Sequence, residues 1–160
     1  MPKILIIDNE EKTGEDTLRE VQLVWPESRL VLEQRVDEAV VAVRDFLRAE
    51  RFDAIVLDIG FTNDLYGGIQ LYNRIAAGAT LRGRWDHTII YTKHASPNVA
   101  DASSESGVFP IRVFVETAGI PVSNIVQSTR GGRGPLIEKI RQLLTSRVER
   151  CRNCGAVREG

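Results

Sequence analysis

The chain has 160 residues, of which 42% are hydrophobic and 27% charged, an ordinary composition for a globular domain. A chain of this length forms one domain with a substantial core, and no apolar run approaches the roughly 20 residues of a membrane span. The N-terminal sequence MPKILII lacks the long apolar segment and cleavage site of a signal peptide. We therefore expect a cytoplasmic protein without a membrane segment.

The formal net charge of −1 is unevenly distributed. Residues 129–160 hold eight Lys/Arg and three Asp/Glu, or +5, which leaves −6 for residues 1–128. A basic C-terminal part could contact nucleic acid or an acidic partner. Arginines spread along a terminal helix are more commonly a solvated face, so we do not expect nucleic acid to be the partner.

The first half of the chain predicts three strands separated by two amphipathic helices. Residues 3–7 (KILII) are a continuous apolar run that ends in acidic residues. Thr13 is a candidate N-cap of the first helix, in which apolar residues recur every three or four positions. A second strand over 29–34 precedes a helix with Asp37 as candidate N-cap, and the third strand covers 52–58 (FDAIVLD).

The second half continues the alternation. Strands are expected at 87–92 (HTIIYT) and 124–128 (NIVQS), and amphipathic helices around 69–75, 108–115 and 135–148. Residues 93–107, rich in Ser, Ala and Asp, are expected to form an extended loop. The whole pattern predicts a five-stranded parallel sheet with helices on both faces.

Polar residues follow three of the apolar strands. Asp8 and Asn9 follow the first, Asp58 ends the third and Thr92 ends the fourth. An unpaired carboxylate inside the core would cost several kcal/mol, so Asp58 is expected at the exposed strand tip. Ligands of open parallel sheets bind at the carboxyl ends of the strands, where these side chains would converge. Carboxylates brought together in this way favour a divalent metal with oxygen ligands.

These residues resemble the receiver domain of bacterial response regulators. The resemblance is carried by KILIIDNE, IVLDIGF, GGIQLYNRI and TIIYT, in that order, and covers roughly residues 3–146. It implies a flavodoxin-like (βα)5 fold with strand order 2-1-3-4-5 for residues 1–148, followed by a basic cysteine-containing tail at 149–160. It also implies a role in two-component phosphorelay signalling, and not that of an enzyme.

The resemblance assigns roles to individual residues. Asp58 would be the phosphoacceptor and Thr92 the hydroxyl that hydrogen-bonds the phosphoryl group. Asp8, Asn9, Asp58 and the carbonyl of Gly60 would hold Mg²⁺. The third motif, GGIQLYNRI, would begin the helix that follows this site.

Several positions depart from the family pattern. Asn9 stands where the family has a second acid, so Mg²⁺ should bind less tightly. Ser128 stands where the fifth strand normally ends in lysine, which removes a cation from the phosphoryl oxygens. Lys93 and Arg130 are candidate substitutes, although a loop lysine is more commonly solvated. Ile125 replaces the usual aromatic residue of the fifth strand, so any conformational switch must use other contacts.

The sequence CRNCG places Cys151 and Cys154 beyond the expected last helix. A C-x-x-C pair is half of a Zn²⁺ site, and zinc needs four ligands. The other two could come from a second chain, giving a zinc-linked homodimer, or, less favourably, from His87 and His94. A pair of reduced thiols in a cytoplasmic tail explains the motif equally well.

Two functions follow from these observations. The first is a stand-alone receiver that a histidine kinase or phosphotransfer protein phosphorylates on Asp58 and that then binds a downstream protein. The alternative is a pseudo-receiver, a protein-interaction module that does not depend on phosphorylation. A phosphate-ester hydrolase of the haloacid-dehalogenase kind would need an aspartate two residues after Asp58, and Gly60 occupies that position.

Overall fold

The computed structural model describes residues 1–61, 67–77, 87–92, 108–128 and 132–154, with the backbone alone for 108–112 and 147–154. Strands and helices alternate along these residues. The strands are β1 (Ile4–Asp8), β2 (Arg29–Leu32), β3 (Ala54–Leu57), β4 (Thr88–Thr92) and β5 (Ile125–Gln127). The helices are α1 (Glu11–Val24), α2 (Val36–Ala49), α3 (Gly67–Ala76), α4 (Val108–Ala118) and α5 (Gly134–Cys154), with a 3-10 turn, η4, at Val122–Asn124.

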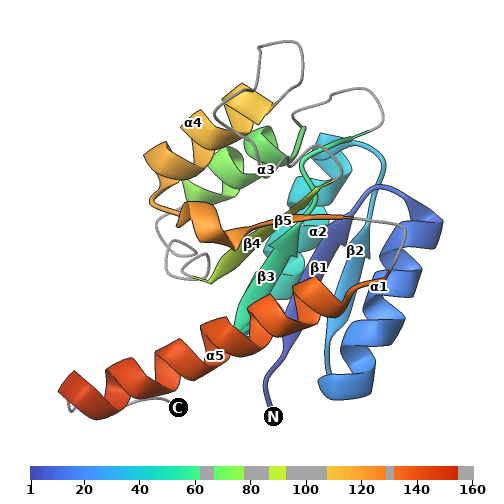
Figure 1. The fold of residues 1–160 in the computed structure, drawn as a ribbon. Coiled ribbons are helices and arrows are strands. Elements are labelled where there is room, and N and C mark those ends of the chain that lie inside the picture. The colour runs from blue at the N-terminus through green and yellow to red at the C-terminus, as the bar shows by residue number, and fades with distance from the viewer. Residues whose placement is uncertain (62–66, 78–86, 93–107, 129–131, 155–160) are drawn as a thin grey trace.

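The five strands form one parallel sheet in the order β2-β1-β3-β4-β5, which confirms the expected fold (Figure 1). Every residue of the three central strands, β1, β3 and β4, is buried. Strands buried on both faces require helices on both sides, as the continuous apolar runs indicated. Among the described residues, no helix has the length and apolar character required to cross a lipid bilayer.

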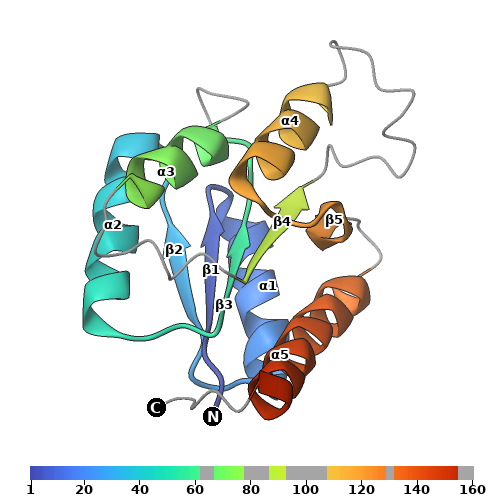
Figure 2. The ribbon, with the colours of Figure 1, turned by 90° about the vertical axis from the view of Figure 1, so that its left-hand side faces the viewer.

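Helices cover the two faces of the sheet unequally. α1 and α5 pack on one face, and α2, α3 and α4 pack on the other (Figure 2). The first face buries Val21 and Trp25 of the α1 segment with Leu136 and Ile140 of α5. Arg133, just before α5, adds a polar link, because its Nε donates to Thr17 Oγ1 of α1 over 3.0 Å.

The two helix starts differ from expectation. Glu10 is the N-cap of α1 and Arg35 that of α2, and neither caps its helix through its side chain. The predictions of Thr13 and Asp37 as N-caps are therefore wrong. For α1 the reason is local: the Asp8 carboxylate already accepts from the Glu10 amide (2.9 Å), and the helix begins with the Gly14 amide donating to the Glu10 carbonyl.

The last helix is longer than expected. α5 runs to Cys154 and extends past the edge of the sheet (Figure 1). Cys151 and Cys154 are thus the end of a helix, and the expectation that they follow it is wrong. The apolar residues that set the helical period stop at Val148, whereas the helical backbone continues to Cys154. The division into a domain at 1–148 and a tail at 149–160 stays a prediction.

Candidate functional site

The carboxyl ends of β1, β3 and β4 bring the expected polar residues together. β1 pairs with β3 so that Ile7 lies beside Leu57, and the Asp58 amide donates to the Ile7 carbonyl over 3.0 Å. Asp8 and Asp58, each one residue further on, therefore emerge at the same edge of the sheet. Asp58 acts as a side-chain hydrogen-bond partner of Asp8 and lowers the Asp8 pKa.

A pocket of about 220 Å³ opens at this edge. Its lining combines the strand-tip residues with the start of α1, the segment after β3 and the end of β5. The described lining residues are Asp8, Asn9, Glu10, Thr13, Asp58, Gly60, Phe61, Tyr91, Thr92 and Ser128. The sequence-predicted residues Asp8, Asn9, Asp58, Gly60 and Thr92 all belong to this set.

Hydrogen bonds fix the acidic side of the pocket. The Gly60 backbone amide donates a hydrogen bond to Asp58 Oδ1 over 3.3 Å. The inward atom of the Asn9 side-chain amide lies 2.9 Å from the Gly60 carbonyl oxygen and 3.0 Å from Asp58 Oδ2. With the amide nitrogen in that place, Asn9 donates to both oxygens. The side chains of Asn9 and Asp58 and the Gly60 carbonyl thus meet at one point.

Burial sets the electrostatics of Asp8. Its side chain is only 5% exposed, and removal from water raises its pKa above the ordinary 3.8. Hydrogen bonding with the Glu10 backbone amide, the Asp58 side chain and the Asn9 backbone amide lowers the pKa of Asp8, and the negative charge of Glu10 raises it further. A carboxylate held against this desolvation is a group that a bound cation would stabilise.

Thr92 and Ser128, two residues with neutral hydroxyl side chains, also line the pocket. Thr92 is 1% exposed at the end of β4, and the Ser128 amide donates to its carbonyl over 2.9 Å. Ser128 directly follows β5 and lines the pocket; its equivalence to the lysine of the family stays a prediction. Thr13 adds a third hydroxyl from the first turn of α1.

Close approach of α3 explains the two glycines at its start. A Cβ on Gly68 would lie 2.4 Å from the Asp58 carbonyl oxygen, and a Cβ on Gly67 would lie 2.8 Å from the Phe61 Cβ atom. Gly60, in contrast, has open space at its Cβ position. The pair Gly67-Gly68 lets α3 begin directly against the backbone that presents Asp58.

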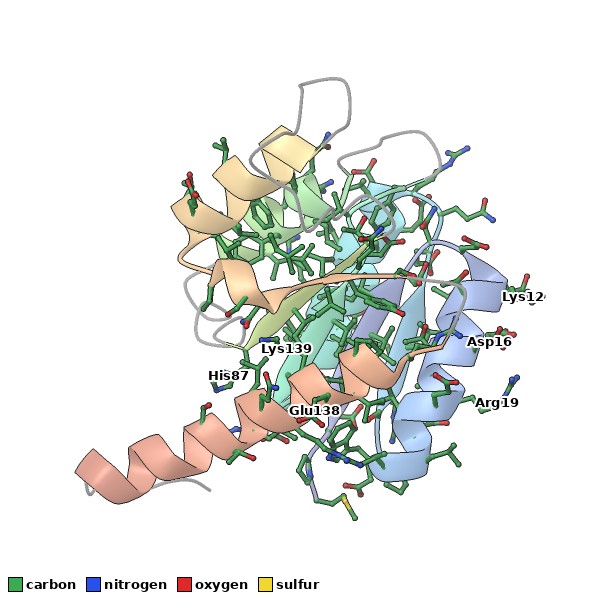
Figure 3. All side chains as sticks on the ribbon, in the orientation of Figure 1. Lys12, Asp16, Arg19, His87, Glu138 and Lys139 are labelled. Atoms are coloured by element: carbon green, nitrogen blue, oxygen red, sulfur yellow. The ribbon has the colours of Figure 1, made fainter. Side chains whose placement is uncertain are left out.

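Other sequence-predicted residues lie outside this assembly. Lys93, His94 and Arg130 fall outside the described residues. His87 directly precedes β4, at the opposite end of that strand from Thr92 and the pocket (Figure 3). Ile125 packs partly against the core. Among the described residues there is no group of three or more His, Cys, Asp or Glu side chains placed to hold a metal, so the candidate oxygen site depends on Asn9 and Gly60.

Sequence reasoning did not assign Thr13, Phe61 and Tyr91 to the pocket. Thr13 is five residues after Asp8, and only the turn between β1 and α1 brings it back over the strand tip. Phe61 and Tyr91 look like ordinary core residues and are 6% and 5% exposed. Their position next to polar residues at strand ends was the one available signal.

We expect Asp8→Asn to stabilise the metal-free fold by about 1 kcal/mol at neutral pH, because the amide can keep the bond from Glu10 without a buried charge. In the wild type, the raised pKa of Asp8 adds stability that is complete below pH 3.8 and is lost as the pH rises through the raised value. Urea unfolding of both proteins from pH 4 to pH 8 measures this. A difference that does not grow with pH would show that the charge of Asp8 has no such cost.

The fold is that of solved receiver domains. The HemR receiver domain of Leptospira biflexa is 17% identical with a TM-score of 0.57, over 100% of this chain and 99% of that one. The receiver domain of a DNA-binding response regulator, merR, of Colwellia psychrerythraea 34H is 14% identical with a TM-score of 0.61, over 91% and 99%. A chain of the complex of histidine kinase ThkA with response regulator protein TrrA is 19% identical with a TM-score of 0.53, over 90% and 99%. No family model matches the sequence, and no curated protein is detectably similar to it.

Proposed function

We propose that this receiver-fold chain is a phosphorelay receiver that accepts a phosphoryl group on Asp58. The observation that supports this most directly is the convergence of Asp8, Asp58, the Gly60 carbonyl and Thr92 on one pocket at the carboxyl edge of the sheet. Solved structures of the same fold include receiver domains and a complex of a histidine kinase with its response regulator. A histidine kinase or phosphotransfer protein is accordingly the proposed phosphodonor.

The proposed chemistry is a transfer between two nucleophiles. A carboxylate oxygen of Asp58 forms a bond to phosphorus, and the bond from phosphorus to the donor's histidine nitrogen breaks. The hydroxyl groups of Thr92 and Ser128, which both line the pocket, donate to the phosphoryl oxygens. Both donors are neutral, so the charge on the product is stabilised less than a lysine would allow.

Mg²⁺ fits the donor set of the acidic wall. Asp8, Asn9, Asp58 and the Gly60 carbonyl supply hard oxygens, and a cation would allow both carboxyl groups to be ionised together. When bound, the ion would neutralise the incoming phosphoryl oxygens. Asn9 can act as a ligand only when its oxygen, and not its nitrogen, faces the pocket.

Incubation of the purified protein with Mg²⁺ and acetyl phosphate tests this function. We expect intact-mass spectra to show the addition of one phosphoryl group, which is absent when EDTA replaces Mg²⁺ and which hydroxylamine removes, as expected for an acyl phosphate. An unmodified protein that also shows no amide shifts with beryllofluoride would favour the second function.

That second function, a phosphorylation-independent pseudo-receiver, is favoured by Asn9 and Ser128 at the metal and cation positions. It would keep the fold as a protein-interaction module. In the first function, phosphorylation would change the affinity of the protein for a downstream partner. In the second, that affinity would be constant. The cytoplasmic location expected from the sequence belongs to the same proposal.

Zinc binding by Cys151 and Cys154 is a separate proposal. The two residues are one helical turn apart at the end of α5, and each chain supplies half of a four-ligand set. If the pair binds zinc across a homodimer, the purified protein should contain about one Zn²⁺ per two chains. Metal analysis with light scattering measures both quantities. Cys151→Ser should then be zinc-free and monomeric, whereas a zinc-free wild type would exclude this site.

A further inference from the structure

The side-chain amide of Asn9 lies where the oxygen atoms of the proposed metal site converge. Its inward atom is 2.9 Å from the Gly60 carbonyl oxygen and 3.0 Å from Asp58 Oδ2. Both neighbours are hydrogen-bond acceptors and neither can donate to it when Asp58 is ionised. Without a cation, an amide oxygen in this place would face two other oxygens at contact distance. The nitrogen, in contrast, would make two hydrogen bonds.

The same distances suit the opposite orientation when a metal is present. Mg²⁺ holds oxygen ligands at about 2.0–2.1 Å in octahedral geometry, so neighbouring ligand oxygens lie about 2.9 Å apart. The two separations measured from the inward Asn9 atom are of this size. The pocket therefore accepts the amide nitrogen without an ion and the amide oxygen with one, with little movement of the backbone.

We propose that the Asn9 side-chain amide is a metal-linked switch, with its nitrogen bound to Asp58 and Gly60 in the metal-free protein and its oxygen turned inward by Mg²⁺. This rests on the proposed metal site and adds a regulatory feature to it. An aspartate cannot do the same, because it has no donor. Asn9 thus holds the two partner oxygens in place before the ion arrives, and Mg²⁺ binds only after two hydrogen bonds are given up.

The local environment supports a real stabilising role for these two bonds. Asn9 and Asp58 are both partly buried and Asp8 beside them is buried, so an amide oxygen turned toward two other oxygens would be poorly solvated. Asp58 also contacts Asp8. A neutral donor that reaches Asp58 reduces the repulsion between the two carboxylates without adding charge.

The side-chain amide of Asn9 can be observed directly. In ¹⁵N-labelled wild type without metal, we expect its two NH₂ resonances to be well separated from those of exposed asparagines and to exchange slowly with water. Saturating Mg²⁺ should move them to the positions of a solvent-exposed amide, while the backbone amides of Asp58 and Gly60 shift in the same titration. Backbone shifts without any change at the Asn9 NH₂ group would overturn the proposal.

Two variants separate the two roles of the amide. Asn9→Ala should lower both the urea midpoint of the metal-free protein and the Mg²⁺ affinity, because it removes the donor and the ligand. Asn9→Asp should also lower the metal-free midpoint at pH 7 but should raise the Mg²⁺ affinity about tenfold. Asn73→Asp, at an exposed position of α3, is the matched control and should change neither quantity.

These outcomes distinguish the switch from the proposed function. If no variant binds Mg²⁺, the metal part of the proposed function fails, and the metal-free midpoints alone decide the donor role of Asn9. Unchanged midpoints in Asn9→Ala and Asn9→Asp would then disprove that role. If Mg²⁺ binds and phosphorylation fails, the resonances of Asn9 still test the switch.

Discussion

Asp58→Asn is expected to abolish phosphorylation by acetyl phosphate, with a loss on the order of a hundredfold or more in modified protein. The substitution keeps the shape of the side chain but replaces the nucleophilic carboxylate by a neutral amide. Asp58 is the carboxylate of the pocket that is partly exposed, whereas Asp8 is buried at 5% exposure. Intact mass after incubation with Mg²⁺ and acetyl phosphate measures the result.

The matched control for this experiment is Asp45→Asn, at an exposed position of α2 that does not line the pocket. It should be modified like the wild type. A thermal unfolding curve of Asp58→Asn should show an intact fold, so that loss of modification reports chemistry and not unfolding. Full modification of Asp58→Asn would place the phosphoacceptor elsewhere in the chain.

Gly68→Ala is expected to destabilise the fold by about 3 kcal/mol, which is a large part of the stability of a domain of this size. The new Cβ would lie 2.4 Å from the Asp58 carbonyl oxygen and 2.7 Å from the Ile59 Cα. Both are backbone atoms, so no side-chain rotation relieves the overlap, and α3 must move away from β3. Because the Asp58 backbone is part of the contact, the pocket should lose Mg²⁺ affinity as well.

Gly134→Ala provides the control for the glycine substitution. Gly134 is the first residue of α5, it is exposed, and a Cβ there has open space around it. The free energy of unfolding of Gly134→Ala should stay within about 0.5 kcal/mol of the wild-type value. Urea unfolding followed by circular dichroism measures both variants. Equal midpoints for Gly68→Ala and the wild type would contradict the close approach of α3 to the Asp58 carbonyl.

The sequence alone predicted the elements whose residues carry a periodic or continuous apolar pattern. The runs at 3–7 and 52–58 identified the central strands because a parallel strand covered on both faces must be apolar throughout. The alternation of these runs with amphipathic helices then required a parallel sheet, and its strand order followed from the family resemblance. Helix starts were predicted poorly. Thr13 and Asp37 have good N-cap side chains, yet each helix begins upstream of them, with the Gly14 amide donating to the Glu10 carbonyl and the Ala39 amide to the Arg35 carbonyl.

The candidate site was predictable in part for the same reason. Strand ends that meet at one edge of a parallel sheet bring Asp8, Asp58 and Thr92 together, so their sequence positions were sufficient to group them. Nothing in the sequence indicated that Thr13 turns back over the pocket or that Gly68 touches the Asp58 carbonyl. Such contacts depend on the path of the chain between elements and on distances of a few ångströms.

Hydrophobic patterning therefore determined the strands, the layers and the edge at which the acidic residues emerge, because burial of apolar surface acts on whole elements. The tertiary structure decided which groups meet at that edge: the pairing of the Asp8 and Asp58 side chains, Ser128 in the pocket lining, and the place of the Asn9 side-chain amide between two oxygens. Hydrogen bonds depend on individual distances and orientations, and these exist only once the chain has folded.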